Sequence, residues 1–381
     1  MKLFDVYPKY PISIEKADGV YVWDDQGARY LDFYGGHAVI SVGHGHKHYV
    51  ERIKEQLNRI GFYSNAVEIP EQLKLADLLG VLSGYPDFQF FMCNSGAEAN
   101  ENAFKLASFH TGRKKIIVFE KGFHGRTSLA VSATDNPQLV AEVNQTDAII
   151  RLPFNNLEAL KNNLNEEVAA VCIEGIQGIS GIYEPNADFL RELSSLCKTN
   201  GTMLILDEIQ SGFGRSGKFF AHQYAEITPD IITIAKGMAN GFPVGGVMIA
   251  PEITAWSGML GTTFGGNQLA CAASLAVLEV IQKEDLISNA ETRGKELKEA
   301  MEAYTLVKEV RGKGLMIGVE FEQPVKSLRQ QLLFDHRIFT GFASNPNTLR
   351  LLPPLSISQE HVQQFLAAFE KVISHETVSV S

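Results

Sequence analysis

The sequence predicts an α/β fold, with a large domain built on a mainly parallel sheet and a smaller α+β unit after it. From about residue 88 to 250, short apolar runs rich in β-branched residues alternate with helical patterns. Such alternation is typical of parallel strands covered by helices. With 381 residues, the chain is long enough for one large core and a second unit.

Five apolar runs are the expected strands of the large domain: FQFFMC, KIIVFE, VAAVCIEG, TMLILDE and IITIAKG. Residues 185–200 form an expected helix, and Gly201 after them is a good helix stop. One face of this helix carries Phe189, Leu193, Leu196 and Cys197.

The exit from the large domain is expected at two helices, one beginning near Gln268 and a more polar one through residues 295–304. Beyond them, the runs LMIGVEF and LRLLPPL and the helical HVQQFLAAFEKVI predict the smaller α+β unit. We expect an N-terminal segment at 1–50 that packs with the small domain, a large domain at 51–279 and a small C-terminal domain at 280–381.

Composition predicts a cytoplasmic protein without nucleic-acid or membrane partners. The formal net charge of -10 argues against a polyanionic partner. The four cysteines form no C-x-x-C pair, which suits reduced thiols. The N-terminal MKLFDVYPKYPISIEKADG is broken by charges and prolines, unlike a signal peptide, and no uncharged apolar run approaches the roughly 20 residues of a membrane helix.

Two charged residues stand at the ends of expected strands. Asp207 closes the run TMLILDE, and Lys236 closes IITIAKG. In parallel α/β sheets, ligands bind at the carboxyl ends of the strands, and burying either charge alone would be costly. A simple ion pair, or an Asp207 side chain that caps the following turn, would also explain these two residues.

A third strand end leads into a helix through FMCNSGAEANENAFKLA. The exposed N–H groups of such a helix start form an anion site suited to phosphate. Ser95 and Glu98 also satisfy the S-x-x-E capping box, which needs no ligand, and the two roles are compatible. A fourth strand end continues into KGFHGRT, which adds an aromatic ring, Phe123, and a guanidinium, Arg126.

Together these strand ends offer an amine, a carboxylate, a phosphate cradle, an aromatic plate and an arginine, as pyridoxal phosphate chemistry requires. The sequence resembles the class III pyridoxal-phosphate aminotransferases of fold type I, and within them the acetylornithine branch. The resemblance covers nearly the whole chain. It rests on GGHAVISVGHGHK, NSGAEANENAFKLA, GFHGRT, LILDEIQSGFGRSG, IAKGMANGFPVGG, GTTFGGNQLACAA, RGKGLMIG and RLLPPL, among which the DEIQSGFGRSG and AKG pair is highly specific.

The resemblance implies a role for each of these groups toward the cofactor, pyridoxal 5'-phosphate. Lys236 would hold it as a Schiff base and later carry a proton, and Asp207 would bind the pyridine nitrogen and make the ring an electron sink. Gln210 would reach the phenolic oxygen, and Phe123 would stack on the ring. The phosphate would be held by Ser95, Gly96, Ala97 and, from the other subunit of a homodimer, Thr263.

The substrates of such an enzyme carry carboxylates, which the planar fork of arginine binds through two parallel hydrogen bonds. Arg126 and Arg350 are the candidates, and Glu174 and Tyr7 are further pocket residues. The resemblance implies transfer of the terminal amine of an N-acylated ornithine to 2-oxoglutarate, giving glutamate and a semialdehyde, in arginine biosynthesis.

One stretch departs from the pattern of the branch. Relatives usually read E-P-x-Q-G-E-G-G, whereas residues 174–181 read EGIQGISG, so that Ile179 replaces an acidic residue. In related ornithine-type enzymes that glutamate masks the arginine corresponding to Arg350. We therefore expect Arg350 to stay free for a carboxylate, and a more acidic donor such as N-succinylornithine to be used as well as or instead of N-acetylornithine.

Rival interpretations remain open from the sequence. Another class III aminotransferase, acting on ornithine, 4-aminobutyrate or a diamine, would carry the same motifs. A nucleotide-binding α/β protein is the distant rival, because GFGRSGK matches part of a P-loop, although Phe219 stands where Ser or Thr would hold magnesium. His44, His46 and His48 alternate as metal ligands might, but a glycine-flanked turn is the favoured interpretation and no metal is expected.

Overall fold

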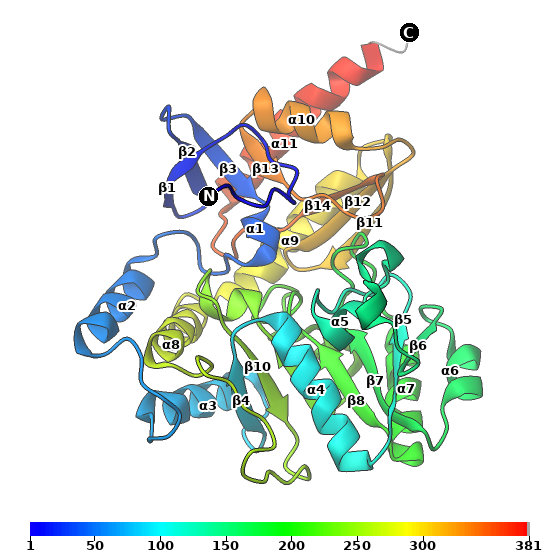
Figure 1. Cartoon of the computed structure of the whole chain (residues 1–381). Helices are drawn as coiled ribbons and strands as arrows, with labels where there is room; N and C mark the ends of the chain where they lie inside the picture. Colours follow the sequence, from blue (N-terminus) through cyan, green and yellow to red (C-terminus); the bar gives the residue numbers. More distant parts are fainter. Residues whose placement is uncertain (379–381) are drawn as a thin grey trace.

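A seven-stranded sheet forms the centre of the larger part of the chain (Figure 1). The computed structural model describes residues 1–378, with side chains as far as residue 374. Pairing is parallel from β9 to β6 and antiparallel on both sides of β10. In spatial order the strands are β4 (Gln89–Cys93), β10 (Gly245–Ile249), β9 (Ile231–Ile234), β8 (Met203–Asp207), β7 (Val168–Glu174), β5 (Lys115–Phe119) and β6 (Ile149–Leu152).

The sheet is buried on both faces because successive side chains of a strand point to opposite sides. On β7, Cys172 packs with the cluster around α4 (Gly96–Thr111), whereas Val171 packs with the cluster around α7 (Ala187–Asn200). The expected helix before Gly201 is confirmed as α7. The other helices of this part are α2 (Lys47–Arg59), α3 (Pro70–Ser83), α5 (Ser128–Ala133), α6 (Leu157–Asn163) and α8 (Gln268–Lys283), with short 3-10 turns η1 (Pro137–Leu139), η2 (Glu142–Asn144), η3 (Ala221–Ala225) and η4 (Lys236–Ala239).

All five expected strands are present, and the apolar runs did not predict β6 and β10. Those two strands are short, and β10 begins with two glycines, which weaken a strand pattern.

The C-terminal unit, predicted as a smaller α+β unit, contains an antiparallel three-stranded sheet covered by helices. Its strands are β11 (Val307–Lys313), β12 (Met316–Phe321) and β14 (Thr348–Leu351), and its helices are α9 (Leu286–Glu302), α10 (Lys326–Phe334) and α11 (Gln359–Val378). The polar helix expected through 295–304 is α9, which begins nine residues before 295. The α11 side chains pack into the same core as the sheet.

The N-terminal strands share a sheet with the C-terminal part. The strands β1 (Ile14–Asp18), β2 (Tyr21–Asp24) and β3 (Arg29–Phe33) are followed in this sheet by β13 (Ile338–Thr340), which is parallel to β3. A short helix, α1 (Gly35–Ala38), follows β3. The division of the chain into three domains stays a prediction, and its boundary at 279/280 falls within α8.

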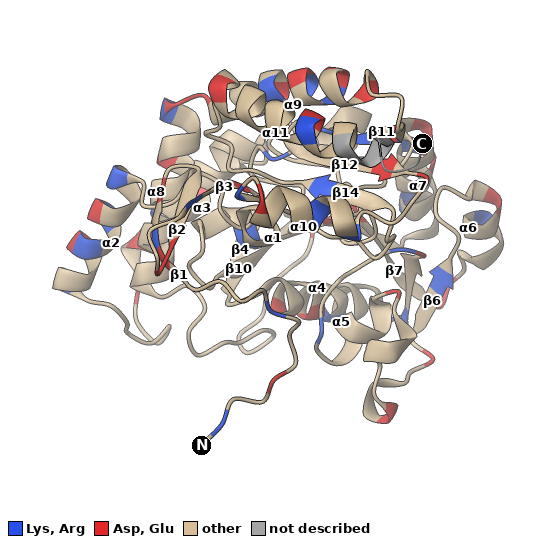
Figure 2. Cartoon of the chain, turned by 90° about the horizontal axis from the view of Figure 1, so that it is seen from above, with Lys and Arg blue, Asp and Glu red and all other residues tan. Residues whose placement is uncertain are grey.

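Charges of both signs alternate over the outer helices, as α2 and α9 in Figure 2 show. Among the residues that the structure describes, no helix combines the length and apolarity needed to cross a membrane.

Backbone contacts fasten the C-terminal unit to the segment that follows β8. Gly294 of α9 lies so close to the turn between β11 and β12 that a Cβ there would be 2.0 Å from the carbonyl oxygen of Gly314. The same turn meets residues 215–217, since the N–H of Leu315 donates to the carbonyl of Arg215 at 2.9 Å. These contacts fix β11 and β12 relative to the strand end that carries Asp207.

Replacing Gly294 with Ala should lower the melting temperature by about 1–2 °C, because the clash outweighs the roughly 1 kcal/mol by which alanine is the better helix former. The methyl group would force α9 away from Gly314, at a cost of roughly 1–3 kcal/mol. Thermal unfolding of the purified variant measures this, with Lys295→Ala, exposed on the same helix, as the control. A higher melting temperature for Gly294→Ala would contradict the close contact.

Candidate active site

Lys236 begins η4 just beyond β9, at the carboxyl edge of the parallel strands. Its φ of 44° lies in the left-handed region, which is unfavourable for a side chain of this kind and is often kept at functional sites. Burial lowers the pKa of the Lys236 amine and Arg350 adds to the effect, against opposing attraction by Asp207 and Glu174. A lowered pKa makes the amine available as a nucleophile and as a base.

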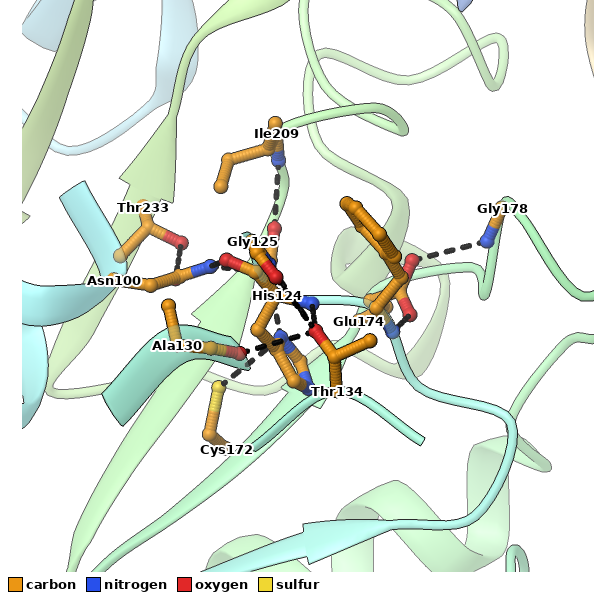
Figure 3. Close-up of polar contacts among 12 residues, drawn as sticks. Asn100, His124, Gly125, Ala130, Thr134, Cys172, Glu174, Gly178, Ile209 and Thr233 are labelled. Atoms are coloured by element: carbon orange, nitrogen blue, oxygen red, sulfur yellow. Dashed lines mark hydrogen bonds and ion pairs between the residues drawn. The ribbon is translucent and has the colours of Figure 1, made fainter. Parts of the chain in front are cut away.

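Asp207, at the end of β8, is only 3% exposed. Its Oδ2 accepts from Asn100 Nδ2 at 2.8 Å and lies 2.8 Å from His124 Nδ1. Its Oδ1 accepts from the N–H of Ile209 at 3.1 Å. Thr233 in turn donates to Asn100 Oδ1 at 2.8 Å, as Figure 3 shows. Three donors around one buried carboxyl suit its ionised form, which only accepts hydrogen bonds.

His124 is a buried hydrogen-bonding partner of Asp207. Burial works against the imidazolium, but the neighbouring Cys172 and Asp207 raise the pKa of His124 well above its usual range. The Cys172 sulfur lies 3.8 Å from Nδ1 (Figure 3). The backbone of His124 is held as well, because its carbonyl accepts from Asn100 at 2.8 Å. The network fixes the position of the Asp207 carboxylate.

The start of α4 lies beside this network. Ser95 is the N-cap, and its hydroxyl accepts from the N–H of Glu98 at 3.2 Å. The predicted capping box is only half formed, because the Glu98 carboxylate accepts from the N–H of Asn94 at 2.9 Å instead of that of Ser95. Within the described chain, the N–H groups of Gly96 and Ala97 have no hydrogen-bond partner. Two free N–H groups at the positive end of a 16-residue helix form a site for an anion.

Close contacts between backbone segments shape this anion site. A Cβ on Gly245 would lie 2.4 Å from the carbonyl oxygen of Ser95, and a Cβ on Gly125 would lie 2.8 Å from the Cβ of Ala97. Only glycine fits at these positions, so β10 and the loop after β5 can press against the helix start.

Glu174 ends β7 and joins two loops of the site. Its carboxyl oxygens accept from the N–H of Phe123 at 2.9 Å and of Gly178 at 3.0 Å. Figure 3 shows the contact with Gly178. Burial is the main cause that raises the pKa of Glu174 to about 7, and Asp207 contributes to the increase.

Arg350, on β14, brings a guanidinium from the C-terminal unit into the site. It is fully buried, and Nη1 donates to the carbonyl of Gly178 at 3.0 Å and to Gln210 Oε1 at 3.4 Å. Its Nη2 is buried without a hydrogen-bond partner in the described structure. Burial lowers the pKa of Arg350 to about 10. Because an unused buried donor is costly, Nη2 is suited to a ligand that accepts.

Residues 5–373 match the family described as Aminotransferase class-III. The chain belongs to the class III aminotransferases. It is 40% identical to the acetylornithine aminotransferase of Bacillus subtilis, over 98% of each chain. It is similar in structure to the ornithine aminotransferase of Toxoplasma gondii, with a TM-score of 0.92 and 27% identity over 98% of this chain and 93% of that one. The acetylornithine aminotransferase of Elizabethkingia anophelis gives a TM-score of 0.84 and 31% identity over 97% and 95%.

The site fits the cofactor of this family, pyridoxal phosphate. A class III aminotransferase needs an amine for the aldehyde, a carboxylate for the pyridine nitrogen and N–H groups for the phosphate. Lys236, Asp207 and the free N–H groups at the start of α4 are groups of these three kinds, and they lie at one edge of the sheet. The predicted α/β fold with a mostly parallel sheet is confirmed by these likenesses.

Four predicted site residues are either exposed or hydrogen-bonded to other protein groups in the single chain. The side chains of Arg126, Thr263 and Tyr7 are exposed, Tyr7 to 73%. Gln210 is buried, and its amide donates to the carbonyl of His37 at 3.0 Å as well as meeting Arg350. The contacts predicted for these four side chains with cofactor or substrate stay predictions.

The prediction from polar residues at strand ends missed three members of this network: Asn100, Thr233 and His124 in its role beside Asp207. A signal existed for the first two, since each is a polar residue in a pattern that is otherwise apolar: Asn100 follows Ala99 on the buried face of α4, and Thr233 interrupts the β9 run. Paired polar residues on facing buried surfaces indicate a hydrogen-bonded network.

The competing signals have structural explanations. The GFGRSGK segment forms turns that lead to η3 rather than to a long helix, and its Arg215 is buried, donating to the carbonyl of Leu315 at 3.2 Å. A P-loop interpretation is therefore wrong. The three alternating histidines meet different carboxylates, Asp32, Glu284 and Glu279, and no cluster of metal ligands occurs among the described residues.

Lys236→Ala should yield folded protein without the visible absorbance band that borohydride bleaches in the wild type, because the amine that binds the cofactor aldehyde is gone. Lys236→Arg should show no aminotransferase activity either, since a guanidinium does not release its proton near neutral pH. Lys218→Ala, which alters an exposed lysine of the GFGRSGK segment, is the control and should keep the band. A bleachable band in Lys236→Ala would contradict the assignment.

Glu174→Gln should change how stability depends on pH in the cofactor-free protein. The folded pKa of Glu174, about 7, lies above the value of 4.5 expected when unfolded, so its contribution is present below pH 4.5 and is lost as the pH rises through 7. The melting temperature of Glu174→Gln relative to wild type should therefore rise by several degrees between pH 5 and pH 8. Glu120→Gln, on an exposed neighbouring loop, controls for lost charge, and parallel curves for Glu174→Gln and wild type would refute the pKa increase.

Proposed function

We propose that this protein transfers the terminal amino group of an N-acylated ornithine to 2-oxoglutarate, giving the acylated glutamate semialdehyde and glutamate, as a cytoplasmic step of arginine biosynthesis. The 40% identity to the B. subtilis protein named acetylornithine aminotransferase, over nearly the full length of both chains, supports this donor class. The observation that carries the acceptor class is the buried Arg350 with its unused Nη2. Such a guanidinium suits one carboxylate of a dicarboxylic substrate.

In this proposal each residue at the strand ends has its own role toward the cofactor or the substrate. Pyridoxal phosphate, when bound, supplies an electron sink for the pair of electrons left when the substrate carbon loses its proton. Lys236 holds the cofactor and moves that proton on Nζ. Asp207 binds the pyridine nitrogen, Phe123 stacks on the ring and Gln210 binds the phenolic oxygen. Ser95, Gly96 and Ala97 bind the phosphate.

Ile179, which lies beside the loop residue that Arg350 contacts, bears on which donor the enzyme uses. Ile179 follows Gly178, whose carbonyl accepts from Arg350, and its own carbonyl accepts from the N–H of Ser344 at 2.9 Å. Within the described chain, no carboxylate lies within ion-pair distance of Arg350. Arg350 therefore stays available to carboxylates in both half-reactions, and N-succinylornithine is used as well as or instead of N-acetylornithine.

The proposed enzyme is a homodimer whose subunits share the site. Thr263 lies exposed on the loop before α8, beside exposed Phe264, and Trp256 of the same stretch is 55% exposed. In the dimer, Thr263 binds the phosphate held by the other subunit. Arg126 and Tyr7, exposed in the single chain, complete the substrate pocket.

A second candidate is another class III aminotransferase acting on ornithine, 4-aminobutyrate or a diamine. The TM-score of 0.92 with the T. gondii ornithine aminotransferase favours an ornithine-type enzyme. The two candidates differ only in the donor, so a donor panel separates them.

With 2-oxoglutarate as acceptor, kcat/KM should be at least tenfold higher for N-acetyl- and N-succinylornithine than for ornithine, 4-aminobutyrate or putrescine, a difference of about 1.4 kcal/mol in transition-state stabilisation. Ile179→Glu should lower kcat/KM for the succinyl donor more than for the acetyl donor, because the new carboxylate would compete for Arg350 and repel the acidic acyl group.

Ile179→Gln is the matched control, since it has the size of Glu without the charge. If ornithine gives the highest kcat/KM, the second candidate replaces the first. If the acetyl donor is clearly preferred and Ile179→Glu leaves that preference unaltered, the succinyl donor is excluded.

A further inference from the structure

Arg311, on β11, uses each of its guanidinium donors within the protein. Its Nε and Nη2 donate to the carbonyl oxygen of Gly181 at 3.3 and 3.0 Å. Nη2 also donates to Thr348 Oγ1 at 3.3 Å, and Nη1 donates to Glu320 at 2.6 Å and to Glu309. With its donors directed to fixed partners and only 8% of its surface exposed, the side chain has one orientation.

The ring of Tyr183 holds the same guanidinium by its face. The Arg311 guanidinium carbon lies 4.4 Å from the ring centroid, and Lys121 Nζ lies 4.0 Å from it. Tyr183 closes a loop, because its backbone and that of Gln177 exchange hydrogen bonds of 2.9 and 3.1 Å. We call residues 177–183 the 177–183 loop. Cation–π contacts and the bonds to Gly181 thus fasten this loop to β11.

The 177–183 loop has no room to move against the strands. A Cβ on Gly318 of β12 would lie 2.6 Å from the carbonyl oxygen of Gly181, and one on Gly312 would lie 2.8 Å from the Ile182 side chain. Ile182 itself has a φ of 62°, which is strained for a β-branched residue. Such a conformation persists only where neighbouring contacts hold it.

The two segments that Arg311 holds are those that surround Arg350. The carbonyl of Gly178, in the 177–183 loop, accepts from Arg350 Nη1 at 3.0 Å. Thr348, which accepts from Arg311, precedes Arg350 by two residues on β14. In the described part of the chain, Arg311 makes no hydrogen bond with Lys236 or Arg350, so its effect on the site passes through these segments.

We propose that Arg311, stacked on Tyr183, is a positioning residue that holds the 177–183 loop and β14 so that the open Nη2 of Arg350 meets a substrate carboxylate. The inference rests on the proposed role of Arg350 and is independent of which amine is the donor. Its loss weakens carboxylate binding and leaves cofactor binding unchanged.

Calorimetric titration of the holoenzyme with glutarate, an unreactive dicarboxylate, tests this. Arg311→Lys keeps the positive charge near Glu320 but loses the paired hydrogen bonds to the Gly181 carbonyl. This variant should raise the Kd for glutarate about tenfold and leave the absorbance of the bound cofactor unchanged. Tyr183→Leu keeps the ionic contacts and should raise the Kd severalfold, and it decides the matter if Arg311→Lys does not fold. Lys308→Gln is the control, because Lys308 pairs with Glu320 at 3.2 Å but contacts neither segment.

The double variant Arg311→Lys with Arg350→Ala distinguishes positioning from independent binding. If Arg311 acts through Arg350, the double variant should bind glutarate no more weakly than Arg350→Ala alone. Additive losses, or an unchanged Kd in both Arg311→Lys and Tyr183→Leu while Arg350→Ala binds weakly, would overturn the positioning role only. An unchanged Kd in Arg350→Ala would overturn the proposed role of Arg350, and this inference with it.

Discussion

The buried carboxylate of Asp207 is the constraint around which the site is arranged. A charge at the end of β8, away from water, is tolerated only if donors surround it. Those donors come from different parts of the chain: Asn100 from α4, His124 from the loop after β5, and the N–H of Ile209 from the segment after β8 itself. Satisfying one carboxylate therefore fixes the start of α4, with its free N–H groups, relative to the strand ends. The free N–H groups at the start of α4 and the carboxylate of Asp207 are thus placed by a single set of contacts.

The second requirement is that backbones approach one another more closely than side chains allow. Gly245 and Gly125 let β10 and the loop after β5 press against the start of α4, and Gly318 lets the 177–183 loop lie on β12. The first pair shapes the site at the start of α4, and the last shapes the end that contains Arg350. The motif glycines thus have a packing role, which explains why glycine-rich stretches recur at each side of the site.

The sequence alone predicted the parts of this arrangement that depend on local order along the chain. Alternating strands and helices, together with the rule that ligands bind at the carboxyl ends of parallel strands, pointed to Asp207, Lys236 and Ser95. It could not predict the partners of those residues. The contacts of Asn100 with Asp207, or of Arg311 with Gly181, join residues more than 100 positions apart, and periodicity indicates that a face is buried without saying what it meets. The strands β6 and β10 were missed for the opposite reason, because their local patterns are weak and pairing with neighbours creates them.

The charges that remain after burial favour a carboxylate ligand beside Arg350. Burial lowers the pKa of Lys236 and raises that of Glu174 to about 7, so the low-polarity surroundings move both groups toward their neutral forms. Asp207 is paired with His124, whose pKa is raised by its neighbours. Arg350 differs, because its lowered pKa of about 10 still leaves it protonated at neutral pH, and no carboxylate of the described chain pairs with it. Arg350 is therefore a buried cation without an ion-pair partner in the described chain, and a carboxylate from a ligand would balance its charge.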